Sequence, residues 1–194
     1  MSRVWRRRPG TATRLIAGRG SGIGGSVTRW VWQRNSKAVG RQRRGFCGIY
    51  MPSRYGNMAQ CAGLALATER IRSGTAIAPI YAQTTEEFAS GAAYIHEVSG
   101  GRFRFGIGIA HGPTHQRLGI TPGKPLADTR AFVEKLKSFD GIGALPPIVL
   151  AALRQRMVAL AAEIAQGVLF ANASLTHLTA SRGRSGCHRS FPRR

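Results

Sequence analysis

The chain has 194 residues, enough for one domain but fewer than the about 250 residues of a typical eight-stranded α/β barrel. No apolar run approaches the about 18 residues of a membrane span, so no membrane partner is expected. The cysteines, Cys47, Cys61 and Cys187, are odd in number and form no Cys-x-x-Cys pair. This pattern fits neither a disulfide framework nor a zinc site, and it predicts a reduced, cytoplasmic setting.

The formal net charge of +21 is concentrated at the two ends of the chain. Residues 1–58 carry 13 Lys and Arg without any Asp or Glu, and residues 182–194 carry five Arg, again without an acid. We therefore predict a basic disordered arm over residues 1–44 and a basic disordered tail over residues 181–194, both in nonspecific contact with polyanions. Residues 45–180 have the nearly balanced charge of an ordinary folded domain.

The first predicted elements follow the arm directly. Residues 46–51 (FCGIYM) predict a buried strand closed by Pro52. The Ala- and Leu-rich residues 58–68 predict a helix, and residues 71–78 predict a second strand stopped by Pro79.

The same alternation then repeats. A helix is expected from Thr84 or Thr85 to Val98, with two glutamates in its first turn and two glycines after its end. The later elements are a strand over 103–110, a helix over about 125–139, a strand over 148–152, a helix over 154–166 and a strand over 168–171. Such alternation predicts an α/β fold with a parallel sheet, and ligands in such folds bind where the carboxyl ends of the strands meet.

Six collinear segments carry a resemblance to a known family. They are residues 67–77 (ATERIRSGTAI), 99–103 (SGGRF), 106–108 (GIG), 124–126 (KPL), 146–153 (PPIVLAAL) and 157–171. In this order and spacing they resemble the luciferase-like monooxygenase family over about two thirds of the chain. The resemblance implies an incomplete TIM-type (β/α) barrel containing strands two to six of eight. It also implies an oxidoreductase that uses FMN or coenzyme F-420, undecided between the two, for hydride transfer or oxygen activation on a small organic substrate.

The resemblance also implies roles for particular residues. A non-proline cis peptide is expected between Ala76 and Ile77, and an apolar floor for the ring at Ile77, Ala78 and Ile109. His111 would donate or accept a proton, and Arg154 would meet a phosphate at a helix N-terminus. Gly106 and Gly108 would let the backbone approach the ring. The residues expected to contact the cofactor are Ala76, Ile77, Ala78, Gly106, Gly108, Ala152, Arg154, Asn172 and Ser174.

The two ends do not continue the resemblance. The family's first strand and helix should precede Phe46, and its last two strands should follow Ser174, yet residues 1–44 and 181–194 resemble neither. We hypothesise that both ends derive from a shifted reading frame of a GC-rich gene. Two other interpretations stay open: an inactive barrel fragment whose free sheet edges favour association, including a homo-oligomer, and a basic nucleic-acid-binding protein.

Three weaker patterns point elsewhere. Residues 20–25 (GSGIGG) match the dinucleotide-binding template but lack a preceding strand and a following acid, so chance is favoured. His111 and His115 have the spacing of a metal pair, but Gly112 and Pro113 between them are expected to prevent a helix. Three tryptophans in the basic arm (Trp5, Trp30 and Trp32) could stack on bases, although nothing in the sequence around them predicts a sheet or groove.

Overall fold

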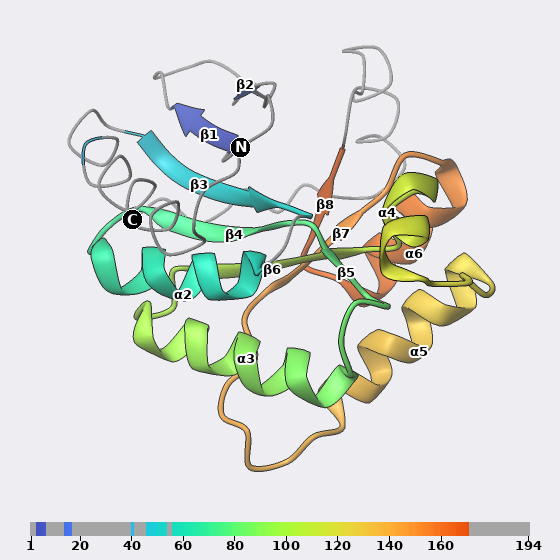
Figure 1. Ribbon diagram of the computed structural model, residues 1–194. Helices are drawn as coiled ribbons and strands as arrows, with labels where there is room; N and C mark the ends of the chain where they lie inside the picture. The colour runs from blue at the N-terminus through green and yellow to red at the C-terminus, as the bar shows by residue number, and fades with distance from the viewer. Residues whose placement is uncertain (1–2, 7–13, 17–39, 41–45, 54–55, 171–194) are drawn as a thin grey trace.

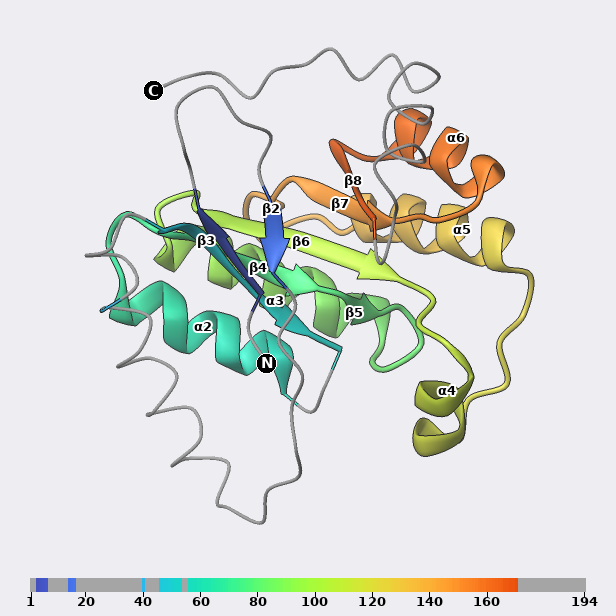
Figure 2. The same ribbon diagram turned by 90° about the horizontal axis from the view of Figure 1, so that it is seen from above.

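The computed structural model of the protein describes residues 3–6, 14–16, 40, 46–53 and 56–170 (Figure 1). The strands within these ranges form one curved sheet in the order β2-β1-β3-β4-β6-β7-β8, and a short strand β5 pairs with β6. Four helices, α2, α3, α5 and α6, lie along one face of this sheet (Figures 1 and 2). The helices and the sheet therefore form two layers with a core between them.

The strands from β3 onward are all parallel. They are β3 (Phe46–Pro52), β4 (Arg72–Ala76), β5 (Ala78–Pro79), β6 (Phe103–Gly108), β7 (Ile148–Ala151) and β8 (Gly167–Leu169). The connecting helices are α2 (Asn57–Ala67), α3 (Thr85–Val98), α5 (Pro125–Lys137) and α6 (Gln155–Ile164). The predicted α/β fold with consecutive parallel βα units is confirmed, and the described sheet corresponds to part of a (β/α) barrel.

Two strands in the N-terminal segment were not predicted. β1 (Arg3–Arg6) pairs antiparallel with β2 (Arg14–Ile16) and, on its other side, antiparallel with β3. The sequence around them lacks the alternation of a half-buried strand, which is why residues 1–44 were expected to be a disordered arm. Most of that arm, the tail over 181–194, and the predicted site residues Asn172 and Ser174 lie outside the described residues.

The main core lies between the helices and the sheet. Phe103 and Phe105 of β6 are fully buried, and Phe88 of α3 packs against Phe105 and Phe132 with ring centroids 5.7 and 5.9 Å apart. Burying an aromatic side chain of this size contributes about 1.5–3 kcal/mol through the hydrophobic effect. Because alternate residues of each strand enter this core, the remaining residues of the same strands face the opposite side of the sheet.

Helix α3 has the predicted ends. The Thr84 hydroxyl accepts a hydrogen bond from the Glu87 backbone N–H at 3.2 Å, and Glu86 and Glu87 occupy the first turn. After Val98 the chain passes through Gly100 and Gly101 with φ values of 60° and 78°, a left-handed conformation that glycine adopts without steric cost. The chain is thereby turned directly into β6.

Arg102, at the start of β6, closes the end of α2. Its guanidinium donates hydrogen bonds to the backbone oxygens of Ala65 (3.0 Å), Thr68 (2.6 Å) and Ile71 (2.9 Å) and to the Thr68 hydroxyl (3.1 Å). The last carbonyls of a helix have no intrahelical donors, and here the Arg102 side chain donates hydrogen bonds to carbonyls at and just beyond the end of α2. The SGGRF segment that carries part of the family resemblance is thus a structural junction.

One prediction about a loop is wrong. Gly112 and Pro113 do not prevent a helix after β6, because α4 (Gly112–Leu118) begins there with Pro113 in its first turn. A proline is tolerated at this position because its missing N–H would have no intrahelical partner anyway. Gly119, with φ of 63°, ends the helix. None of the helices in the described ranges has the length and apolar character needed to cross a membrane.

Candidate functional site

The face of the sheet opposite the described helices α2, α3, α5 and α6 (Figure 2) carries a second, smaller apolar cluster, which we call the inner cluster. Ala76, Ile77 and Leu169 are its buried members, and Tyr50, Ala110, Val149 and Ala151 pack against them. These residues come from β3, the link between β4 and β5, β7, β8 and the segment after β6. Most of them lie near the carboxyl ends of their strands. The inner cluster therefore forms an apolar surface at the edge of the sheet where ligands bind in folds of this class.

The link between β4 and β5 has the predicted backbone. The Ala76–Ile77 peptide bond is cis, as expected from the family resemblance. The Ile77 carbonyl accepts a hydrogen bond of 3.0 Å from the side-chain amide of Asn57, which is 7% exposed at the start of α2. Asn57 was not predicted as a site residue; the only signal in the sequence was an amide at the first residue of a helix, and such residues ordinarily serve the helix itself.

The predicted apolar floor is divided between the two faces of the sheet. Ile77 belongs to the inner cluster, but Ala78 is fully buried in the main core and Ile109 packs against that core. The change of face between Ile77 and Ala78 follows from the alternation of side chains along an extended chain. Val149, Ala151 and Leu169 occupy the inner face instead.

The two predicted glycines accommodate neighbouring strands. A Cβ atom added to Gly106 would overlap the carbonyl oxygen of Thr75, whose hydroxyl also donates to the Gly106 carbonyl at 2.6 Å. A Cβ atom at Gly108 would lie 2.8 Å from Cδ1 of Ile77 and 3.0 Å from Cβ of Ala151. Glycine at both positions keeps the inner face closely packed.

The neighbourhood of β7 and α6 combines a buried alanine with exposed cations. Ala152 is 3% exposed, and its backbone N–H donates to the Leu169 carbonyl at 3.1 Å. Arg154 is the exposed N-cap of α6; its side chain makes no capping hydrogen bond, and the first turn holds Arg156 and no acidic residue. A helix N-terminus flanked by two guanidinium groups attracts anions.

His111 is exposed at the N-cap of α4, three residues beyond the end of β6. Figure 2 shows α4 beyond the carboxyl ends of β5 and β6. The histidine therefore lies at the predicted edge of the sheet, with its ring accessible from solvent.

Tyr81, which was not predicted as a site residue, connects several elements near the carboxyl ends of the strands. The Tyr81 hydroxyl donates to the Asp128 carboxylate at 2.6 Å, and the Tyr81 ring meets the His115 ring edge-on with centroids 6.1 Å apart. His115 Nε2 lies 2.6 Å from the Ile109 carbonyl oxygen. Burial, together with the hydrogen bond to Asp128, raises the pKa of Tyr81 to about 12, so this phenol stays a donor. Tyr81 follows β5 by two residues, which was the available signal.

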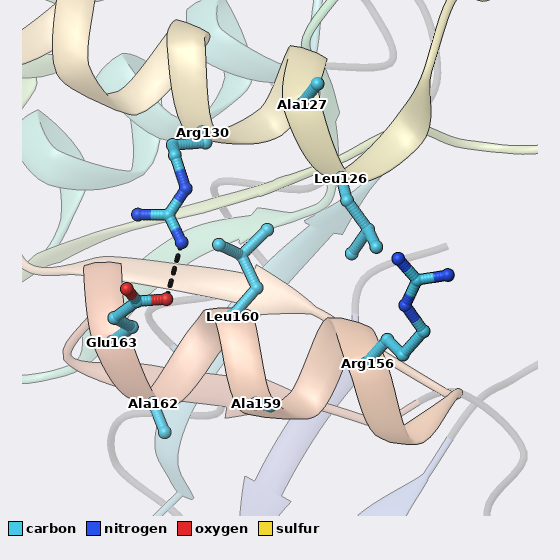
Figure 3. Close-up of a pocket in the computed structure, with 8 residues that line it drawn as sticks. All are labelled: Leu126, Ala127, Arg130, Arg156, Ala159, Leu160, Ala162 and Glu163. Atoms are coloured by element: carbon cyan, nitrogen blue, oxygen red, sulfur yellow. Dashed lines mark hydrogen bonds and ion pairs between the residues drawn. The ribbon is translucent and has the colours of Figure 1, made fainter.

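A surface groove lies elsewhere, on the helix layer. It has a volume of about 770 Å³ and runs between α5 and α6 on the helix layer (Figure 3). Leu126 and Leu160 form its apolar part, and Arg130 and Glu163 join the two helices by an ion pair of 2.5 Å. The groove lies on the helix layer, away from the inner cluster, and Arg156 lines it at the start of α6 (Figure 3). No group of three His, Cys, Asp or Glu side chains suited to a metal occurs within the described part of the chain.

Comparisons with known proteins agree with this architecture. The family model for luciferase-like monooxygenase matches residues 37–140. The chain is 37% identical over 131 residues to 5,10-methylenetetrahydromethanopterin reductase of Archaeoglobus fulgidus, covering 57% of this chain and 39% of that protein. It is 28% identical over 156 residues to the enzyme of that name from Methanolobus tindarius, covering 69% of this chain and 48% of that protein. The chain thus spans less than half the length of either relative.

Solved structures share the fold at low sequence identity. The coenzyme F-420 dependent tetrahydromethanopterin reductase from Methanopyrus kandleri superposes with a TM-score of 0.67 at 18% identity, covering 79% of this chain and 56% of that one. The oxygenating constituent of 3,6-diketocamphane monooxygenase from Pseudomonas putida, in complex with FMN, gives a TM-score of 0.68 at 14% identity, covering 84% and 58%.

Proposed function

Because the chain belongs to the luciferase-like monooxygenase family, we propose that it binds coenzyme F-420 or FMN at the carboxyl edge of its sheet and acts as an oxidoreductase on a small organic substrate. The observation that carries the proposal is the inner cluster, which places apolar side chains, three of them alanines, from several strands at the carboxyl ends of the sheet. A flat ring system needs such a floor, and alanine and glycine leave room for it.

The polar end of the cofactor has a matching surface. Arg154 and Arg156 at the start of α6 would hold a phosphate, since the first turn of this helix contains no competing carboxylate. In the proposal, Asn172 and Ser174, which follow β8 in the sequence and lie outside the described residues, add polar contacts. The bound ring would supply the redox chemistry, either hydride transfer or oxygen activation.

The side chains at the edge would manage protons and access. His111 is proposed to donate or accept a proton at the reacting substrate, because an imidazole can do either and this one is exposed. The Tyr81 and Asp128 pair would fix the loop after β5 against α5 and so set one wall of the substrate space.

The named relatives favour coenzyme F-420 as the first cofactor to test. Both curated relatives are named as methylenetetrahydromethanopterin reductases, and the Methanopyrus structure is described as coenzyme F-420 dependent. For this chain we infer hydride transfer as the leading reaction, with oxygen activation on FMN as the second.

Cofactor titration tests the proposal directly. Adding coenzyme F-420 or FMN to the full chain is expected to change the fluorescence of the ring on binding. The double variant R154A/R156A should weaken binding by about tenfold to a hundredfold, because charge-assisted hydrogen bonds to a phosphate contribute about 1.5–3 kcal/mol. K135A, which removes an exposed cation of α5, is the matched control and should bind as the parent does. A folded chain that binds neither cofactor would refute the proposal.

The role of His111 has a separate test. With a competent substrate and saturating cofactor, H111Q is expected to lower the single-turnover rate by about 10²–10⁴-fold, the usual contribution of a positioned acid or base. Its cofactor dissociation constant should not change, because the residue is assigned to the substrate side. An unaltered single-turnover rate in H111Q would remove His111 from the proposed chemistry.

A further inference from the structure

A second pocket lies at the opposite edge of the sheet, near the amino ends of β6 and β7. It has a volume of about 460 Å³. Its polar lining consists of His96 from α3, Arg104 from β6, Lys137 from α5 and Gln166 from the turn before β8. No carboxylate lines it, although the described elements around it carry several acidic residues on their exposed surfaces. We call it the basic pocket.

Two polar atoms of this pocket are buried without a partner. Neither Nδ1 of His96 nor Nε of Arg104 has a hydrogen-bond partner within the described structure. A buried polar atom left unsatisfied costs about 1–3 kcal/mol, so such atoms ordinarily mark a place where a ligand or solvent completes the site. Nε of Arg104 is a hydrogen-bond donor, and Nδ1 of His96 becomes one when the ring is protonated, because the ring already makes a backbone hydrogen bond at Phe103.

The other contacts hold the donors in place. Nη1 of Arg104 donates to the carbonyls of Gly101 at 2.9 Å and Phe103 at 2.8 Å, which fixes the guanidinium plane. Oε1 of Gln166 accepts from the Ile148 backbone N–H at 2.8 Å, so the opposite end of this amide presents its N–H₂ donors. Nζ of Lys137 donates to the Ile164 carbonyl at 3.2 Å, and an ammonium group has two further N–H bonds.

The positive charge of Arg104 disfavours the protonated form of His96. Burial, and then the nearby Arg104, lower the pKa of His96, and burial followed by the charge of Arg72 lowers the pKa of Arg104. The charged or titratable groups near His96 are Arg104, Lys137 and its own exposed neighbour Glu97. An anion placed between Arg104 and Lys137 would offset the effect of the Arg104 charge on His96.

We propose that the basic pocket binds the oxyanion of a small molecule, a phosphate or carboxylate group held by Arg104, Lys137, Gln166 and His96. The apolar residues Leu145, Pro146 and Pro147 line the same pocket and suit the organic part of such a molecule. The pocket is separate from the candidate cofactor site because it lies at the amino ends of the strands. The proposal therefore does not depend on the proposed oxidoreductase activity.

Inorganic phosphate and acetate serve as the probes, each compared with sodium chloride at equal ionic strength. The histidine ring protons of the full chain are followed by NMR while pH is varied, and H96Q identifies the resonance of His96 among the five histidines. A bound anion is expected to raise the pKa of His96 by about one unit, because an opposite charge within about 4–6 Å favours the charged form. The midpoint of thermal unfolding should also rise with the probe and not with chloride.

A matched pair of lysine variants on α5 locates the effect. K137M is expected to weaken probe binding by about tenfold or more, since a hydrogen bond to a charged group contributes about 1.5–3 kcal/mol. K135M removes the same charge from an exposed position of the same helix and should leave binding unchanged. Because Lys137 also donates to the Ile164 carbonyl, the unfolding temperature of each variant is first measured without probe, and only the change on adding probe is compared. The proposal is overturned if neither probe shifts the His96 titration beyond the effect of chloride, or if K137M binds as tightly as K135M.

Discussion

Replacing Gly106 with alanine is expected to abolish stable folding. The new methyl group would coincide with the Thr75 carbonyl oxygen, which is backbone and cannot rotate away as a side chain would. Thr75 is fully buried, and its hydroxyl already donates to the Gly106 carbonyl, so the two strands have no space to separate. We expect a loss of more than about 4 kcal/mol, within the range that unfolds many domains outright. Circular dichroism with urea titration measures the loss.

Gly91 provides the control for this substitution. It lies within α3, and a Cβ atom there would meet only Cε of Met58 at 3.7 Å, which is ordinary van der Waals contact. G91A should therefore stabilise the chain by about 0.5–1 kcal/mol, since alanine is favoured over glycine inside a helix. If G106A and G91A had similar stability, the close approach of Thr75 to β6 would be wrong.

Replacing Arg102 with methionine is expected to destabilise the fold by about 3 kcal/mol. Methionine keeps much of the length and apolar stem, so the change isolates the loss of the guanidinium. The carbonyls of Ala65, Thr68 and Ile71 would lose their side-chain donors at the end of α2, and unsatisfied acceptors of this kind are costly. Equilibrium unfolding in urea would give the free-energy difference.

The lysine variant separates charge from geometry at the same position. R102K keeps the positive charge but has a single nitrogen, so it cannot reach all the oxygens that the two guanidinium nitrogens now contact. We expect R102K to recover less than half of the stability lost in R102M. Full recovery would show that charge alone matters and that the multiple contacts to α2 do not.

The parallel fold was predictable because its signals are local. Alternating apolar strands and helices with short loops define consecutive βα units, and Thr84 together with Gly100 and Gly101 gave both ends of α3 in advance. The cis bond between Ala76 and Ile77 came from the family resemblance alone. No pattern of composition or spacing distinguishes that bond from an ordinary one.

The errors concern a strand that forms through contacts distant in sequence and a helix whose start was placed wrongly. β1 pairs with β3, which lies 40 or more residues further along the chain, and no local sequence pattern indicates such a partner. The helix at α4 was excluded because Pro113 was treated as an interior residue, whereas the structure places it in the first turn. Whether Pro113 is compatible with the helix depends on where the helix starts, and a shift of two residues in that start changes the answer.

The sequence indicated where the candidate site would lie, at the carboxyl ends of the strands, better than it indicated the individual residues. The rule that the carboxyl ends of parallel strands meet led to His111 and Arg154, and Ile77, expected from the family resemblance, lies in the inner cluster. Ala78 was expected in the floor beside Ile77, but consecutive residues of an extended chain face opposite sides, so Ala78 lies in the main core. The contacts of Tyr81 with Asp128 and His115 join three different elements, so they emerge only in three dimensions.

The antiparallel pairing of β1 restricts how the sheet can grow. Each edge of β3 already has a neighbour, β1 on one side and β4 on the other, so its backbone N–H and C=O groups are committed in both directions. A strand running in the direction of β3, whatever its source, therefore has no place beside it. Among the described strands, β8 ends the parallel series with one neighbour, β7, and further parallel strands of a barrel would have to be added next to it.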